Sequence, residues 1–117
     1  MLIFYHYPNC STCKKAKKWL DTHNLPYQAI PIHEQPPTAQ QLHDFWQRSG
    51  LPLKKFFNTS GLAYRERQLK TVLPTLSEHE QLELLASDGM LIKRPLLISE
   101  TAVVVGFKEA EWEQFQH

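Results

Sequence analysis

The sequence has 117 residues, which fits one domain with its own hydrophobic core. Hydrophobic residues make up 42% of it and charged residues 21%, an ordinary globular balance. The net charge is +1, so the chain lacks the strong basic excess of nucleic-acid-binding proteins, and direct binding to nucleic acid is not expected.

No segment has the features of a targeting or membrane-spanning element. The apolar residues 1–5 are too short for a signal-peptide core, and no apolar run approaches the roughly 20 residues that cross a bilayer. We therefore expect a cytoplasmic protein without a membrane partner, and a monomer. Because structural disulfides are rare in the cytosol, two cysteines three positions apart need a chemical explanation.

The first part of the chain is predicted to form a strand, a helix and a strand. Residues 2–7 are aromatic and aliphatic, which indicates a buried strand. Apolar residues at helical spacing then predict a helix from Ser11 or Thr12 to about His23. A second strand follows over residues 27–32, and a strand–helix–strand unit implies a parallel pair.

Residues 33–89 are predicted to form a mostly helical insertion. Two of its helices begin with capping boxes, Thr38 with Gln41 and Ser77 with Glu80, in which side chain and main chain satisfy each other. The segments between these helices are predicted as a short turn or helix over 53–57, a polar loop over 58–61 and a short helix over 63–69.

The last part of the chain returns to strands. Residues 96–98 and 103–105 are apolar segments joined by a short turn, which predicts a β-hairpin. A helix over 108–116 that buries Trp112 and Phe115 completes the chain. The element order predicts an α/β protein with a mixed four-stranded sheet. We expect one domain, 1–117, with its core in 1–32 and 90–117 and its insertion in 33–89.

Cys10 and Cys13 lie between the first strand and the first helix. Unpaired N–H groups and the helix dipole make the first turn of a helix partly positive. A sulfur there is stabilised as a thiolate, the reactive form, and Lys14 and Lys15 are expected to act in the same direction. The sequence therefore predicts a redox pair in which Cys10 attacks and Cys13 resolves the intermediate.

His6 lies four residues before Cys10, at the end of the first strand. A protonated imidazole there would lower the pKa of Cys10 further, although an ordinary strand histidine is an equal alternative. A structural zinc site is disfavoured because it needs four ligands and the sequence has a single cysteine pair. Two unrelated buried thiols are the remaining alternative, and no bound cofactor or metal is expected.

Three segments together resemble the arsenate reductase-like family, which includes the ArsC reductases and the Spx and MgsR regulators. They are Tyr5-His6-x-Pro8-x-Cys10-x-x-Cys13, Lys93-Arg94-Pro95-Leu96 and Val105-Gly106-Phe107. The resemblance covers essentially the whole chain, and residues 56–61 resemble an uncharacterised branch. It implies a thioredoxin-like fold with a helical insertion, and a cis Pro95 that faces the cysteine with Arg94 near the sulfur.

The resemblance also implies an anion site beside Cys10. The binding residues are then Arg94 and Pro95, together with the first helical residues Ser11, Thr12 and Lys14. ArsC reductases carry two further arginines, which fall near Asn58 and at Gly106 here. Tight binding of arsenate requires convergent bidentate donors, so the absence of the two arginines disfavours efficient arsenate reduction.

Three functions are compatible with these residues. The favoured one is a thiol–disulfide oxidoreductase served by an external thiol donor such as thioredoxin, glutaredoxin or a small thiol. The second is an arsenate reductase that depends on the same donors. The third is a Spx-like redox-sensing regulator, in which Arg94 and a glycine such as Gly50 would contact the C-terminal domain of the RNA polymerase α subunit.

Overall fold

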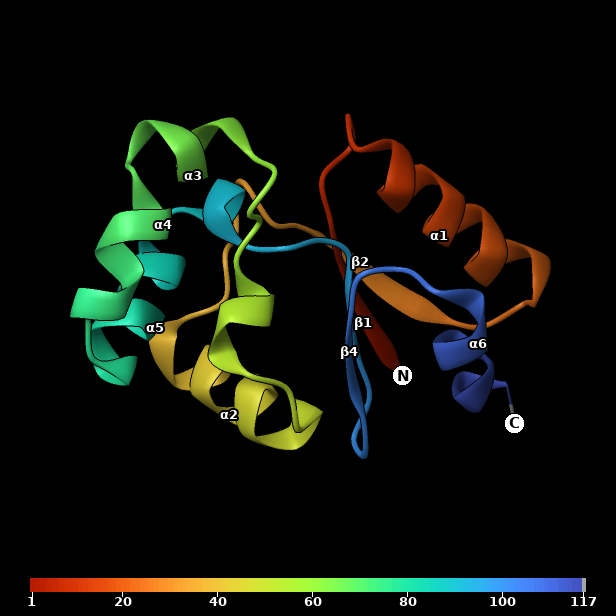
Figure 1. The fold of residues 1–117 in the computed structure, drawn as a ribbon. Helices are drawn as coiled ribbons and strands as arrows, with labels where there is room; N and C mark the ends of the chain where they lie inside the picture. Colours follow the sequence, from red (N-terminus) through yellow and green to blue (C-terminus); the bar gives the residue numbers. More distant parts are fainter. Residues whose placement is uncertain (117) are drawn as a thin grey trace.

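Four strands form one mixed sheet in the order β2-β1-β3-β4 (Figure 1). The computed structural model describes residues 1–116, so residue 117 of the predicted domain lies outside the described residues. β1 (Leu2–His6) pairs in parallel with β2 (Tyr27–Pro31) and antiparallel with β3 (Leu96–Ile98). β3 pairs antiparallel with β4 (Val103–Val105). The mixed four-stranded sheet and the C-terminal hairpin are thus confirmed.

One face of the sheet is covered by α1 (Ser11–Thr22) and α6 (Glu109–Trp112) (Figure 1). Side chains alternate across a strand, so Phe4 faces these helices and packs with Trp19 and Trp112. The predicted last helix is shorter than expected, because η4 (Glu113–Phe115) continues it as a 3-10 turn. Trp112 is fully buried as predicted, whereas Phe115 is only partly buried.

The other face of the sheet is covered by the helical insertion (Figure 1). Both predicted capping boxes are present, and Gly50 ends the first helix in the left-handed conformation (φ 70°). The predicted helix over 63–69 is wrong as a single element, because Gln68 adopts φ 53° and divides it in two. The insertion comprises α2 (Ala39–Ser49), η1 (Leu53–Phe56), α3 (Leu62–Glu66), α4 (Leu69–Val72), η2 (Leu73–Thr75), α5 (Glu78–Ser87) and η3 (Gly89–Leu91).

The insertion and the sheet share one hydrophobic core. Tyr5 and Val103 from the sheet belong to the same buried cluster as Phe45 of α2 and Leu85 of α5. This shared burial fixes the insertion against the strands, and with it the chain segments that lead into β3. Within residues 1–116, no helix combines the length and the apolar character needed to cross a membrane.

Candidate active site

Cys10 is the N-cap residue of α1. A turn after β1 brings the Cys10 N–H to the Tyr7 carbonyl at 3.0 Å, and Cys10 itself is extended (φ −90°, ψ 119°). Its Sγ accepts a hydrogen bond from the Cys13 N–H at 3.4 Å. The sulfur therefore holds the position that a serine or aspartate oxygen usually takes at a helix start.

The environment of Cys10 favours its thiolate. Burial raises the pKa of the Cys10 thiol, but the Cys13 N–H, a hydrogen bond from the Cys13 thiol, the charge of Arg94 and the Thr12 N–H outweigh it. The net result is a pKa below the ordinary value. Its direction is the one expected for a sulfur at a helix start.

Cys13 has the opposite tendency. Its side chain is only 2% exposed, and burial is the main reason that its pKa is raised to about 12. The charge of the Cys10 thiolate and the hydrogen bond to it raise the pKa further, while the Tyr7 main chain and Arg94 lower it. Both thiols are free in this structure. One of them is thus ready to ionise and the other keeps its proton.

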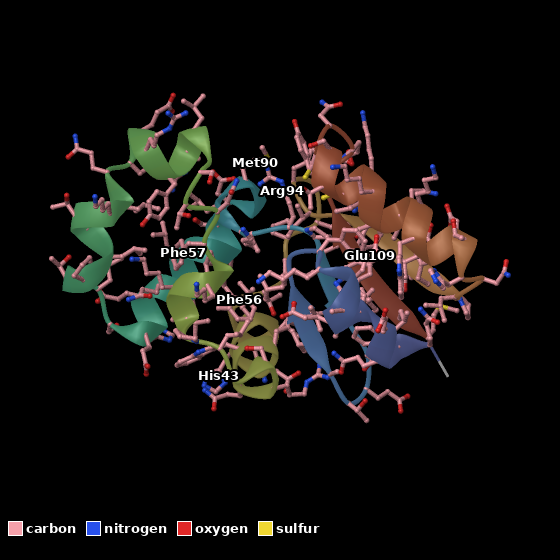
Figure 2. All side chains as sticks on the ribbon, turned by 45° about the vertical axis from the view of Figure 1, so that its right-hand side comes forward. His43, Phe56, Phe57, Met90, Arg94 and Glu109 are labelled. Carbon is pink, nitrogen blue, oxygen red and sulfur yellow. The ribbon has the colours of Figure 1, made fainter. Side chains whose placement is uncertain are left out.

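Arg94 lies where the insertion meets the sheet, next to Met90 (Figure 2). Its Nη1 donates to the carbonyls of Met90 at 3.3 Å and Ile92 at 3.4 Å, and its guanidinium lies 5.1 Å from the centre of the Tyr7 ring. The Arg94–Pro95 peptide is cis, as the family resemblance implies. Arg94 Nε is buried and has no hydrogen-bond partner among the described residues. The side chain is therefore fixed with one donor left free.

The positive charge that lowers the Cys10 pKa belongs to Arg94, and not to Lys14 and Lys15 as predicted. Lys14 and Lys15 are exposed on α1, and neither belongs to the groups of the described chain that shift the Cys10 pKa. Ser11 and Thr12 are exposed at the start of α1, where the Thr12 N–H takes part. Lys14 and Lys15 are close to Cys10 in the sequence, but their side chains lie on the exposed face of α1.

His6 does not act on Cys10 in the way that was predicted. Its ring stacks on Phe4 with 5.3 Å between the ring centres. Burial, His33 and Lys17 all lower its pKa, which leaves the imidazole neutral at pH 7. Nor does His6 occur among the described groups that shift the Cys10 pKa. Stabilisation of the thiolate by a protonated His6 has no support, and any catalytic role of this residue stays a prediction.

The two arginines missing from the ArsC pattern are not replaced by their sequence neighbours. Arg67 is paired with Asp88 at 3.0 Å, and Arg65 lines a separate pocket of about 350 Å³ beside α4. At Gly106, the space that a side chain would enter is bordered by Lys93, whose Cε lies 3.6 Å from an ideal Cβ position. A lysine thus occupies the neighbourhood of one missing arginine.

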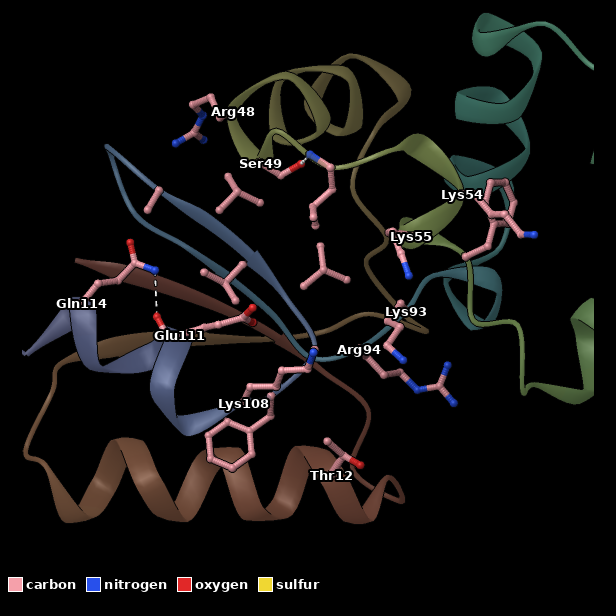
Figure 3. Close-up of a pocket in the computed structure, with 18 of the residues that line it drawn as sticks. Thr12, Arg48, Ser49, Lys54, Lys55, Lys93, Arg94, Lys108, Glu111 and Gln114 are labelled. Atoms are coloured by element: carbon pink, nitrogen blue, oxygen red, sulfur yellow. Dashed lines mark hydrogen bonds between the residues drawn. The ribbon is translucent and has the colours of Figure 1, made fainter.

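A cleft of about 920 Å³ begins at Thr12 and Arg94 and follows β4 between α6 and the insertion (Figure 3). This cleft could not be predicted from the sequence, because its charged residues are scattered along the chain. Its cationic side chains are Arg48, Lys54, Lys55, Lys93, Arg94 and Lys108, and its one carboxylate is Glu111. Over residues 1–116, no three His, Cys, Asp or Glu side chains gather as metal ligands would.

The sheet order and the cysteine at the start of α1 define a thioredoxin-like protein, and the helices between β2 and β3 are its insertion. The sequence model of the ArsC family matches residues 5–115. The chain is 58% identical over 113 residues to the uncharacterized protein YusI of Bacillus subtilis, covering 97% of this chain and 96% of that protein. The chain therefore belongs to the ArsC family.

Other relatives carry different names. A possible arsenate reductase from Streptococcus mutans has a solved structure with a TM-score of 0.90 and 51% identity, over 97% of both chains. The global transcriptional regulator Spx of Lactiplantibacillus plantarum is 29% identical over 115 residues, covering 98% of this chain and 86% of the regulator. The family thus contains proteins named as reductases and proteins named as regulators.

Proposed function

We propose that this protein is a thiol–disulfide oxidoreductase in which Cys10 is the nucleophile and Cys13 the resolving thiol. The observation that carries the proposal is the opposite shift of two neighbouring thiols, with the Cys10 pKa lowered and the Cys13 pKa raised to about 12. In such a pair one sulfur is available as the attacking thiolate, and the other stays protonated until it resolves the mixed disulfide.

The first step is attack by the Cys10 thiolate on a substrate disulfide. A bond forms between Cys10 Sγ and one substrate sulfur, the substrate S–S bond breaks, and the second substrate sulfur leaves as a thiolate that takes up a proton from water. The Cys13 N–H and Arg94 hold the Cys10 charge until this attack.

The second step is attack by Cys13 on Cys10 Sγ. Once Cys10 is in a mixed disulfide its negative charge is gone, and with it two of the causes that raise the Cys13 pKa. Cys13 then loses its proton more readily, forms the Cys10–Cys13 disulfide and releases the other substrate half as a thiolate. The substrate gains two electrons, which an external dithiol or two small thiols must return to the protein.

The test is a single oxidation cycle. Reduced protein treated with a small excess of glutathione disulfide should lose two hydrogens, and peptide mapping should locate one disulfide between Cys10 and Cys13. Dithiothreitol should then restore both thiols. If no such internal disulfide forms under mild oxidant, the proposal is wrong.

Reduction of an oxyanion such as arsenate is a second candidate, which the free Nε of Arg94 favours. Cys10 would displace hydroxide from arsenic(V), and attack of a second thiol on the Cys10 sulfur would form a disulfide and release arsenite. Arsenate should then slow alkylation of Cys10 in the wild type and not in an Arg94→Ala variant. Equal alkylation with and without arsenate in the wild type would remove this candidate.

The regulator hypothesis is favoured by the relatives named Spx and MgsR, at 29% and 26% identity. In that case the disulfide would change a docking surface near Arg94 and would not process a substrate. A pull-down with the C-terminal domain of the RNA polymerase α subunit tests it. Failure of both the reduced and the oxidised protein to bind would exclude it.

A further inference from the structure

β4 is an edge strand with main-chain groups that point away from the sheet. Ser99 N–H donates to the Ala102 carbonyl and Gly106 N–H to the Pro95 carbonyl, each at 2.8 Å. In an antiparallel ladder only every second residue bonds to a given neighbour. The main-chain N–H and C=O of residue 104 therefore point toward β3, as do the bonded main-chain groups of residues 102 and 106. The N–H and C=O groups of Val103 and Val105 point outward, away from β3. No strand of the described chain pairs with that edge.

This free edge borders the cleft that begins beside the cysteine pair. Val103 and Val105 line the cleft together with Thr12 and Arg94. α6 forms one wall, and α2 with η1 forms the other (Figure 3). A volume of about 920 Å³ lies in the usual range for ligand-binding clefts. It leaves room for a short extended peptide.

The cleft also carries a strong local positive charge that the net charge of +1 does not reveal. Six of its lining side chains are cationic and one is a carboxylate. Of the six, Arg48 alone takes part in an ion pair of the described residues, with Asp44 at 3.0 Å. The other five have no carboxylate within ion-pair distance among the described residues, so an anionic ligand would meet unpaired cations in the cleft.

We propose that the cleft is a docking site for an extended acidic segment of a partner protein, which adds as a further strand to the free edge of β4. Main-chain hydrogen bonds to Val103 and Val105 would hold the segment, and its carboxylates would face the lysines of both walls. This docking site would bind the partner of the proposed oxidoreductase, so its biological role rests on that proposed function. The binding itself needs neither sulfur.

A peptide fits these features better than a nucleic acid. The donors and acceptors of a strand edge match another main chain in spacing and direction. Single-stranded nucleic acid is usually held by stacking of successive bases on aromatic platforms, and the cleft has two phenylalanines, Phe57 and Phe107, at separate points of its lining.

The test uses a Cys10→Ser protein and a synthetic acidic peptide, acetyl-Thr-Glu-Val-Glu-Val-Glu-amide. Binding should slow amide hydrogen exchange at Val103 and Val105 at least tenfold, while Val104, already bonded to β3, changes little. The same peptide with N-methylated main-chain nitrogens keeps its charge and should bind at least tenfold more weakly. A Lys55→Gln/Lys108→Gln variant should also bind weakly, whereas Lys18→Gln on the exposed face of α1 should not differ from its parent.

Three outcomes would overturn the inference: equal binding of the N-methylated peptide, unchanged exchange at Val103 and Val105, or equally tight binding of a short oligothymidylate. Each leaves the formation of a Cys10–Cys13 disulfide in the wild type untouched. The two proposals therefore fail separately.

Discussion

The main-chain N–H of Cys13 donates to the sulfur of Cys10 across 3.4 Å, so the resolving residue also stabilises the nucleophile. This N–H contribution does not depend on the Cys13 side chain, whereas the Cys13 thiol donates a second hydrogen bond that also lowers the Cys10 pKa. A serine at position 13 keeps the main-chain donor and offers a hydroxyl donor, so it should remove resolution and leave much of the activation in place.

A Cys13→Ser variant should trap the intermediate that the wild type resolves. With glutathione disulfide it should accumulate a mixed disulfide on Cys10 at least tenfold above the wild-type level, because no second thiol can attack the Cys10 sulfur. Intact-mass spectrometry with peptide mapping measures this. Cys10→Ser is the matched control and should form no adduct, so an adduct located on Cys13 would reverse the assigned roles.

An Arg94→Ala variant should make Cys10 less reactive at neutral pH. Removal of the guanidinium removes one of the causes that lower the Cys10 pKa, so less thiolate is present and alkylation by iodoacetamide should slow several-fold. Lys14→Ala should react at the wild-type rate, since Lys14 is exposed and does not shift that pKa. Equal slowing in both variants would point to general surface charge as the cause.

The buried thiol of Cys13 should make stability depend on pH. Its pKa rises from the ordinary value of 9.0 to about 12 in the folded chain, so above pH 9 the unfolded state binds fewer protons than the native state. The free energy of unfolding should then fall as pH rises from 9 toward 12. Cys10 acts oppositely, because its lowered pKa adds stability that is lost as pH falls through the folded value.

Urea denaturation of the reduced protein at pH 8 and pH 10 measures the Cys13 effect. In a Cys10→Ser background, the stability advantage of the protein that keeps Cys13 over its Cys13→Ala variant should shrink at the higher pH, because burial raises the Cys13 pKa. That background is needed because the Cys13 thiol also lowers the Cys10 pKa, and the remaining titrating groups then cancel in the difference. A constant difference between the two proteins at both pH values would show that the Cys13 pKa is not raised on folding.

Gly89 should be indispensable where the insertion returns to the sheet. An added Cβ would collide with the carbonyl oxygen of Ile32, a main-chain atom that cannot rotate away. Gly89→Ala should therefore destabilise the protein by about 3 kcal/mol, the upper part of the usual cost of overpacking. Chemical denaturation measures the change.

Gly50→Ala is the natural control for that substitution. Its added Cβ would meet no atom within 4 Å, but its φ of 70° favours glycine, so a cost of about 1 kcal/mol is expected. A loss at Gly89 no larger than the loss at Gly50 would show that the chain relaxes away from the contact with Ile32.

The parts of the structure that could be predicted are those that depend on neighbours in the sequence. The capping boxes at Thr38 and Ser77 and the cysteine at the start of α1 are local patterns, and each has the predicted geometry. The left-handed Gln68 was not predictable in this way, since glutamine carries no turn signal, and it divides what reads as one helix.

The remaining parts of the site depend on tertiary contacts. Arg94 acts on Cys10 from 84 positions further along the chain, a relationship that only the family resemblance suggested. The cationic cleft draws Arg48 and Lys108 from segments 60 positions apart. No run of charged residues in the sequence predicts this cleft, because its side chains come together only when the sheet and the insertion have folded.

The claim on which the oxidoreductase proposal depends is that Cys10 ionises before Cys13. NMR titration of the two ¹³Cβ signals in the reduced protein tests it most directly, because both thiols are followed in one sample. We expect Cys10 to titrate below the ordinary thiol value of 9.0, and Cys13 to stay protonated well above pH 10. Titration of both signals together near pH 9 would contradict the proposed division of roles.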